Sequence, residues 1–316
     1  MKRNVLLRFS IFLKGMAMGI ADIIPGVSGG TIAIITGVYE EFLSTLNRID
    51  FKIFKLLFNG EFKKTSKKYN LSFLLSLSIG IFTSIIILSH YITYFIENYP
   101  IALWSFFFGL ILSSIFFLFN QIKSWNLKNF QFVFTTKLYL LVFGLLIAIY
   151  IQTLNPGKNE INNIYLFFCG MISITAMLLP GISGAYILIL LGAYETILNT
   201  LKEVVKLNLD YFLNFFSFIL GAIISIKLFS KFLTWGYKNY KDNTLSCLIG
   251  FMIGSLPVLW PWKIEIISKD FFISNLYIPS FNSQNSTLIE GIIFMLLGIG
   301  VVFILEYLSK KNAKEK

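Results

Sequence analysis

The sequence predicts an all-α polytopic membrane protein that is organised as an inverted repeat. Of its 316 residues, 56% are hydrophobic and 14% are charged, whereas a soluble domain carries roughly 25% charged and about 45–50% apolar residues. Long apolar runs recur along the chain, and two more apolar regions are interrupted by a Pro-Gly pair. The residues around these two interruptions match each other at an offset of 155 positions. This composition excludes nearly all soluble-enzyme folds.

Six apolar runs are candidates for membrane-spanning helices. A helix needs about 20 apolar residues to cross the hydrocarbon core of a bilayer. We expect one span in each run, and the third run is short enough that its flanks must extend it. The six predicted spans are 71–96, 101–121, 137–153, 212–233, 245–262 and 288–308.

Two further apolar regions, 9–46 and 164–201, are broken in the middle. The breaks read Pro25-Gly26-Val27-Ser28-Gly29-Gly30 and Pro180-Gly181-Ile182-Ser183-Gly184-Ala185. Each break leaves two arms of about 15 residues, which is too short for a single span. Such a segment forms either a re-entrant hairpin, which enters and leaves on one side, or one broken helix that crosses fully.

The distribution of basic residues favours the hairpin model. The chain has 27 Lys and Arg against 16 Asp and Glu, a formal net charge of +11. Lys and Arg of short loops concentrate on the cytoplasmic side. With two hairpins and a cytoplasmic N-terminus, 22 of the 27 basic residues fall on the inside. If the broken segments crossed fully, the basic cluster from Arg48 to Lys68 would lie outside.

We therefore expect a multi-pass protein of the cell inner (cytoplasmic) membrane, with both termini in the cytoplasm. The basic N-terminus precedes an apolar stretch, but no signal-peptidase site precedes the first break, so we expect this segment to be retained. The outer face is near neutral, and the basic excess therefore gives no indication of a nucleic-acid partner. The partner that composition indicates is the lipid bilayer.

The repeat divides the chain into halves 1–157 and 158–316, each with one hairpin and three spans. Because three is odd, the second half enters the membrane from the opposite side, and inverted repeats with broken helices are typical of alternating-access transporters. The alternative is a duplication that serves stability alone. Gly80 and Gly109 also match Gly221 and Gly250, at an offset of 141. The matches at an offset of 155 are Gly15/Gly170, Met16/Met171, Ala21/Ala176, Pro25/Pro180, Gly26/Gly181, Ser28/Ser183, Gly29/Gly184, Ile32/Ile187, Gly37/Gly192, Tyr39/Tyr194, Glu40/Glu195 and Leu46/Leu201.

The chemistry of the two breaks suits a small anion. Proline removes a backbone donor, and the glycines permit a turn and a close approach of backbone to ligand. The second arm then begins with unpaired N–H groups, which Ser28 or Ser183 can cap. The remaining donors and the helix dipole favour an anion, above all phosphate. The simpler alternative is a tight turn between short helices.

Three acidic residues are candidates for ion coupling. Asp22 occurs only in the first copy, and Met177 stands at the equivalent position of the second copy. An acid beside a membrane-embedded break is costly without a partner or a function, so Asp22 is a candidate for proton or sodium coupling, with capping of local N–H groups as the alternative. Glu40 and Glu195 lie near the far ends of the second arms. For these two we favour an interfacial or packing role over coupling.

Three basic residues, Arg8, Lys14 and Lys227, lie within or beside apolar segments on the expected cytoplasmic side. They are candidates for neutralising an anionic headgroup, although such residues more often extend to the membrane interface. Cys169 and Cys247 sit in apolar runs, which excludes a disulfide framework and a cysteine metal site. We expect no metal, cofactor or catalytic residue.

The paired motifs resemble a widespread prokaryotic membrane family, the PopT-type polyprenyl-phosphate transporters. The resemblance rests on residues 15–31 with Gly37-Val38-Tyr39-Glu40, and on residues 178–184 with Gly192-Ala193-Tyr194-Glu195, and it covers nearly the whole chain. It implies that undecaprenyl phosphate returns from the outer to the inner leaflet for reuse in cell-envelope synthesis. Ala185 stands where a serine is common in such second motifs. The implied site positions are Asp22, Pro25, Gly26, Ser28, Gly29, Gly30, Thr31, Pro180, Gly181, Ser183 and Gly184.

Two other functions are compatible with the same architecture. An undecaprenyl-pyrophosphate phosphatase also combines inverted repeats with re-entrant loops, but its chemistry needs an arginine in the loop and a nearby Glu or His. Neither break contains arginine. The other alternative is an ion-coupled transporter of a small anion.

Overall fold

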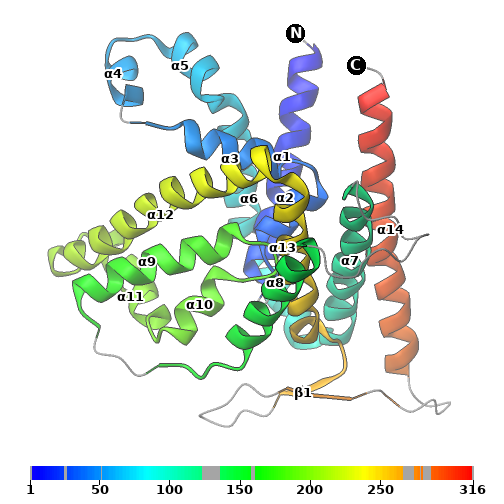
Figure 1. Ribbon diagram of the computed structural model, residues 1–316. Helices are drawn as coiled ribbons and strands as arrows, with labels where there is room; N and C mark the ends of the chain where they lie inside the picture. The colour runs from blue at the N-terminus through cyan, green and yellow to red at the C-terminus, as the bar shows by residue number, and fades with distance from the viewer. Residues whose placement is uncertain are drawn as a thin grey trace.

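A computed structural model describes residues 2–24, 27–50, 52–122, 136–157, 161–265, 274–277, 279 and 286–314. The described chain is almost entirely helical (Figure 1). The first half contains α1 (Lys2–Ile23), α2 (Gly29–Ile35), α3 (Tyr39–Arg48), α4 (Lys52–Phe58), α5 (Phe62–Tyr69), α6 (Leu71–Asn98), α7 (Pro100–Gln121) and α8 (Thr136–Gln152). The second half contains α9 (Asn163–Leu178), α10 (Gly184–Leu190), α11 (Tyr194–Val205), η1 (Leu209–Tyr211), α12 (Phe212–Asn239), α13 (Lys241–Ser255), η2 (Leu256–Leu259), β1 (Lys263–Glu265), β2 (Ser274–Leu276) and α14 (Ser286–Lys314).

The helices confirm a multi-pass membrane protein. Five helical segments are long and apolar enough to cross a bilayer: Leu71–Asn98, Pro100–Gln121, Leu209–Asn239, Lys241–Leu259 and Thr287–Tyr307. They coincide with five of the six predicted spans. The remaining predicted span, 137–153, forms α8, an apolar helix of 17 residues. Its N-terminal flank, 123–135, lies outside the described residues.

The second arm of each broken segment differs from the single helix that we expected. Each arm divides into a seven-residue helix and a longer one, α2 with α3 and α10 with α11. Gly37 and Gly192 cause the division, because both adopt a positive φ of 72° and 66°. In the first arm, Gly37 N–H donates to Ile34 O and Val38 N–H to Ala33 O, and the second arm repeats both bonds. This is the Schellman pattern that ends a helix at a left-handed glycine.

The helix pairs are related by the repeat, two within the halves and two between them. The pair α1 and α6 corresponds to α9 and α12, and α7 with α14 corresponds to α13 with α8. Glycines permit the close crossings: a Cβ at Gly80 would overlap the carbonyl of Phe12, and a Cβ at Gly221 would overlap that of Phe167. Phe12 and Phe167 are themselves related by the 155-residue offset. The sequence repeat therefore corresponds to a repeat of packing contacts.

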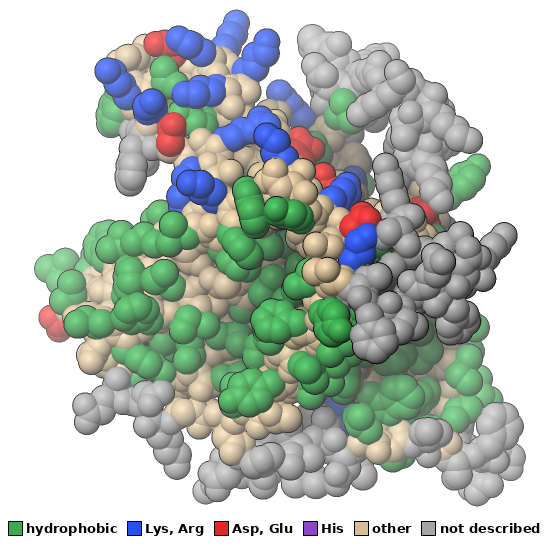
Figure 2. Space-filling view, in the orientation of Figure 1, with side chains coloured by type: hydrophobic (Ala, Val, Ile, Leu, Met, Phe, Trp, Pro, Cys, Tyr) green, Lys and Arg blue, Asp and Glu red, His purple; other side chains and the backbone are tan. Residues whose placement is uncertain are grey.

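The two ends of the molecule differ in charge. Both termini, α4 and α5 lie at the upper end in Figure 1, and the α6–α7 turn and the β1–β2 ribbon lie at the lower end. Lys and Arg side chains gather at the upper end, while apolar side chains cover the middle (Figure 2). This band of exposed apolar side chains is where a membrane would surround the protein.

A short antiparallel ribbon is a feature that we did not predict. Strands β1 and β2 have three residues each, and Lys263 pairs with Leu276. The fifth predicted span, 245–262, forms most of α13 and then η2, whose second residue is Pro257. The ribbon follows directly and connects η2 toward α14 at the lower end of the molecule.

Candidate functional site

The two breaks meet in the structure, although about 150 residues separate them in the chain. The hydroxyl of Ser28 donates to the carbonyl of Leu179 at 3.1 Å. The backbone N–H of Gly181 donates to Thr31 Oγ1 at 2.9 Å. These bonds join residues that precede or begin α2 with the segment between α9 and α10. We call the two segments 24–31 and 178–186 the first and second tips.

Ser28 and Ser183 cap α2 and α10, as the sequence predicts for their positions. Gly30 N–H donates to Ser28 Oγ at 3.1 Å, and Tyr186 N–H donates to Ser183 Oγ at 3.4 Å. Both serines adopt extended backbone angles, which is the usual conformation of an N-cap residue. The second capping bond is the longer one, and Ser28 alone also contacts the opposite tip.

Glycines allow the tips to pack closely. A Cβ at Gly30 would lie 3.1 Å from the carbonyl oxygen of Met177 and 3.5 Å from that of Leu178. Gly181 has a positive φ of 82°, and a Cβ there would lie 2.7 Å from the carbonyl oxygen of Phe251 in α13. Pro180 is buried beside it. Pro25 and Gly26, the other two predicted positions in the first tip, lie outside the described residues.

Asp22 lies at the end of α1 and points to the start of α2. Its Oδ1 accepts a hydrogen bond of 2.7 Å from the backbone N–H of Gly29. Its Oδ2 is buried and has no hydrogen-bond partner among the described residues. A Cβ at Gly29 would lie 2.6 Å from Oδ2, so glycine is required for this approach. Asp22 thus already accepts the hydrogen bond of Gly29 N–H, one of the donors that we expected to bind an anion.

The basic candidates lie apart from the tips. Lys14 donates to the carbonyl of Thr36 at 2.7 Å, at the end of α2. Lys227 donates to the carbonyl oxygens of Asn47 and Ile49, at the end of α3. Cations at these places satisfy free carbonyl groups at helix C-termini. Arg8 is exposed on α1. In this conformation none of the three residues contacts a tip.

Glu40 and Glu195 occupy equivalent places in the first turns of α3 and α11. Both are exposed. Glu40 forms an ion pair of 2.7 Å with Lys241, the first residue of α13. Both glutamates lie where a helix dipole favours a negative charge. Glu40 therefore links the two halves and does not belong to a tip.

Sequence reasoning missed Tyr39 as a residue of the tip contact. Its buried hydroxyl donates to the carbonyl of Leu178 at 2.6 Å. The ring of Tyr39 packs edge-on against that of Tyr237, at a centroid distance of 5.8 Å. The repeat does contain Tyr39 and Tyr194, but a shared tyrosine carries no information about which tip it contacts.

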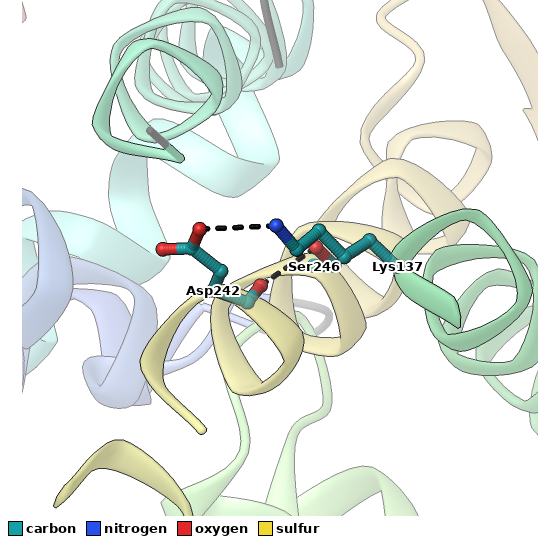
Figure 3. Close-up of polar contacts among 3 residues, drawn as sticks. All are labelled: Lys137, Asp242 and Ser246. Atoms are coloured by element: carbon teal, nitrogen blue, oxygen red, sulfur yellow. Dashed lines mark hydrogen bonds and ion pairs between the residues drawn. The ribbon is translucent and has the colours of Figure 1, made fainter. Parts of the chain in front are cut away.

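A second link between the halves lies at the start of α13. Lys137 of α8 forms an ion pair of 3.1 Å with Asp242, and the Ser246 hydroxyl donates to the Asp242 carbonyl (Figure 3). Both side chains of the ion pair are largely buried, with 19% and 28% exposed. The adjacent residues Lys241 and Asp242 therefore connect α13 with α3 and with α8.

A cavity of about 720 Å³ lies between α2–α3 of the first half and α12–α13 of the second. Its walls come from α2, α3, the end of α7, the end of α12 and α13. Tyr39 belongs to the wall and also bonds to the second tip. The lining is mixed, since Glu40, Glu41 and Lys238 stand beside leucines.

The family model that describes undecaprenyl phosphate translocase-like proteins matches residues 18–272 of the chain. The chain belongs to this family. A relative named polyprenyl-phosphate transporter from Vibrio cholerae is 37% identical over 314 residues, which cover 96% of this chain and 97% of the relative. A relative of the same name from Staphylococcus aureus is 35% identical over 263 residues, or 79% of this chain and 85% of the relative. No solved structure matches the chain. The family resemblance of the two motifs is thereby confirmed.

Proposed function

We propose that this family member is a transporter of undecaprenyl phosphate, which it returns from the outer to the inner leaflet of the cytoplasmic membrane. The names of its relatives support a polyprenyl-phosphate substrate. The contact between the two tips is the observation that carries the proposal. Polar broken helices are tolerated in a membrane only where protein buries them or where they line a cavity. Here they meet each other between two repeats.

The halves are, in this proposal, inverted repeats with one re-entrant hairpin each. The recurring pairs α1–α6 and α9–α12 support a common architecture of the halves. The end that carries both termini, α4 and α5 faces the cytoplasm, because its basic side chains follow the rule for cytoplasmic loops. The hairpins then enter from opposite faces, and their tips meet near the midplane.

The headgroup binds where the tips now contact each other. Ser28 and Thr31 direct their hydroxyl groups to the second tip in the present conformation. When one half rotates against the other, these hydroxyl groups and the N–H group of Gly181 become free for phosphate oxygens, whereas Gly29 N–H and Gly30 N–H stay bonded within the first half to Asp22 and Ser28. The helices α2 and α10 have only seven residues and therefore small dipoles. Individual hydrogen-bond donors at the tips then contribute more to phosphate binding than the helix dipoles do. The prenyl chain stays in the lipid.

Asp22 provides a physical route to ion coupling. Its carboxylate already accepts from Gly29 N–H, so a phosphate at the first tip must compete with it. Two anions at one donor repel each other, and protonation of Asp22 removes this repulsion. Phosphate binding and proton binding are then favourable together, which links transport to the proton gradient. Glu40 and Glu195, being exposed, are placed outside this coupling step.

Transport between leaflets can be measured with the purified protein in liposomes that contain a labelled polyprenyl phosphate. We expect Ser28→Ala to slow transfer strongly and Ser183→Ala to slow it less, because only Ser28 both caps a helix and contacts the opposite tip. Ser76→Ala is the matched control: this serine donates to the carbonyl of Ser72 within α6, away from the tips. Transfer at wild-type rates in both tip variants would contradict the site.

The same preparation distinguishes transport from phosphatase chemistry. We expect no release of inorganic phosphate from undecaprenyl pyrophosphate. Release that persists after removal of contaminating phosphatases would replace the proposed function with the enzymatic alternative. Transfer of a soluble anion without transfer of the lipid would favour the small-anion transporter instead.

A further inference from the structure

The cavity has a wall that is partly polar, whereas a packing defect in a helix bundle is lined by apolar side chains. One helix face of α12 supplies Thr234, Tyr237 and Lys238, whose spacing of three and four residues places them on one side. Leu43, Leu118 and Leu245 supply apolar surface on the other elements. The cavity therefore joins a polar wall to an apolar one.

The polar wall contains groups without partners. Lys238 forms no ion pair with any described residue. The hydroxyl oxygen of Thr234 is buried and has no hydrogen-bond partner in the described part of the chain. Most hydroxyl groups within these helices behave differently: that of Ser114, for example, donates to the carbonyl of Leu110, four residues earlier. A buried donor without a partner is unfavourable, but the Thr234 oxygen is not accessible from the cavity, so Lys238 is the polar group that an occupant can contact.

An exchangeable ion pair borders the same cavity. Glu40 lines the wall and pairs with Lys241 at 2.7 Å. The two side chains are 57% and 51% exposed, and exposed pairs of this kind contribute little to stability. Lys241 is not among the lining residues and reaches the cavity only through Glu40. The Glu40 carboxylate can turn toward solvent and leave Lys241, three positions after Lys238 in the chain, to another anion.

We propose that this cavity is a second station for a prenyl phosphomonoester, on the side of the molecule that carries both termini. Lys238 and Lys241 bind the phosphate, and Glu40 is a carboxylate that occupies Lys241 until the headgroup displaces it. The leucines contact the first isoprene units. Glu41 remains as one negative charge in the wall, so the site gains a positive balance only when Glu40 has moved away.

The position of the station relative to the tips gives it a role. Tyr39 forms part of the cavity wall and bonds to the second tip, and Ile34 of α2 also lines the cavity. In this proposal, a headgroup that leaves the tips toward this end reaches the cavity past Tyr39, because no described tip residue lines the cavity itself. The station thus receives the lipid after the tips release it, and this assignment rests on the proposed function for the identity of the ligand.

Binding of farnesyl phosphate, a short prenyl phosphomonoester, to the full-length protein in detergent tests the station. We expect Lys238→Gln to raise the Kd about tenfold, because one charge-assisted hydrogen bond is lost, and Lys238→Arg to restore most of the affinity. Glu40→Gln should lower the Kd by about two- to fivefold, because it removes the competing carboxylate. Lys63→Gln is the matched control, since it removes the same charge from exposed α5 at the same end of the molecule.

Lys238→Gln and Glu40→Gln are expected to change the Kd for farnesyl phosphate in opposite directions, which makes the test decisive. A Lys238→Gln variant that binds like Lys63→Gln, or a Glu40→Gln variant that binds more weakly than wild type, would overturn the proposal. Inorganic phosphate is the second probe: binding with the same variant pattern but no binding of farnesyl phosphate would assign the cavity to free phosphate and also overturn it. Phosphatidylglycerol, a phosphodiester, should not compete.

Failure of the station and failure of the transport function have different signatures. If wild-type protein transfers polyprenyl phosphate and the cavity variants bind farnesyl phosphate unchanged, only the station is wrong. If wild-type protein neither binds farnesyl phosphate nor transfers polyprenyl phosphate, the proposed function is wrong as well.

Discussion

At the scale of single residues, the two tips are related by sequence but differ in chemistry. Ser28 caps α2 and contacts the other tip, whereas Ser183 caps α10 through a longer bond of 3.4 Å. Thr31 accepts from the opposite backbone, and Tyr186 takes its place in the repeat. Asp22 has no acidic counterpart. If the substrate binds at the tips as proposed, its binding energy at the first tip differs from that at the second.

The difference between the serines predicts a difference in stability. We expect Ser28→Ala to lower the free energy of unfolding by about 2 kcal/mol, from the lost cap and the lost bond to Leu179, and Ser183→Ala by about 0.5–1 kcal/mol. Thermal unfolding in detergent, followed by fluorescence, measures both. Equal midpoints for the two variants would show that the contact of Ser28 with the second tip contributes nothing to stability.

Asp22 leads to a prediction about pH. Protonation favours phosphate at the first tip, so wild-type transfer should decline as pH rises through the range in which Asp22 ionises. Asp22→Asn keeps an oxygen acceptor for Gly29 N–H and never ionises, so its transfer rate should lose the part of the pH dependence that comes from Asp22 and keep only the part that comes from ionisation of the phosphomonoester. Leaflet-transfer rates over a pH series in liposomes test this. A pH profile that the substitution leaves intact would exclude Asp22 as the coupling group.

At the scale of elements, the broken second arms set the geometry of each hairpin. Gly37 and Gly192 end the short helices and redirect the chain into α3 and α11. The bend between α10 and α11 is 111°. In the first arm, the chain turns at Gly37, Glu40 lies at the start of α3 and pairs with Lys241 of α13, and Tyr39 bonds to the second tip. Tyr39 thereby connects the second tip with the cavity.

Replacement of these glycines should destabilise the protein to different degrees. An alanine at either position adopts an unfavourable positive φ, which costs about 1 kcal/mol. At Gly192 the new Cβ would also overlap the carbonyl of Gly157, whereas the space around Gly37 is open. We therefore expect a larger fall in Tm for Gly192→Ala than for Gly37→Ala. Gly300→Ala is the control, because that helical position is open and alanine favours a helix. The reverse order of the Tm changes would contradict the strain argument.

At the scale of the whole molecule, polar contacts among the described residues join the halves in at least three places. One is the contact of the tips, and the second is the end that carries both termini, where Lys241 and Asp242 pair with Glu40 and Lys137. Lys227 adds bonds to carbonyls at the end of α3. The third is the end of α8, where the Gln152 side chain donates to the carbonyl of Gly254 in α13 at 2.7 Å. Relative movement of the halves must exchange contacts at these places.

The proposed orientation is testable by labelling of single cysteines. In a variant that lacks Cys169 and Cys247, we introduce Lys63→Cys in α5 or Lys202→Cys in α11, both exposed. A membrane-impermeant maleimide should label Lys202→Cys in intact cells and Lys63→Cys only after permeabilisation. Labelling of both positions from the outside would contradict the inverted repeat, and leaflet transfer by each variant verifies that the protein is intact.

The sequence by itself determined the features that depend on local composition. Apolar runs of span length identified α6, α7 and α12–α14, because transfer of a helix to lipid depends on its own side chains. The repeated Pro-Gly-x-Ser-Gly motif identified both tips and their serine caps, since a cap bonds to its own helix. The repeat also contained Gly37 and Gly192, but without the positive φ their role as helix ends was missed.

Only the tertiary structure decided which groups meet. The bonds from Tyr39 to Leu178, from Ser28 to Leu179 and from Gly181 to Thr31 join residues 139 to 151 positions apart. No local pattern encodes such pairs, because they depend on how two halves pack as whole bodies. The same packing commits Lys14 and Lys227 to helix ends, pairs Glu40 with Lys241 and creates the cavity. Composition placed this protein in a membrane, and the packing of its halves brought the two tips together.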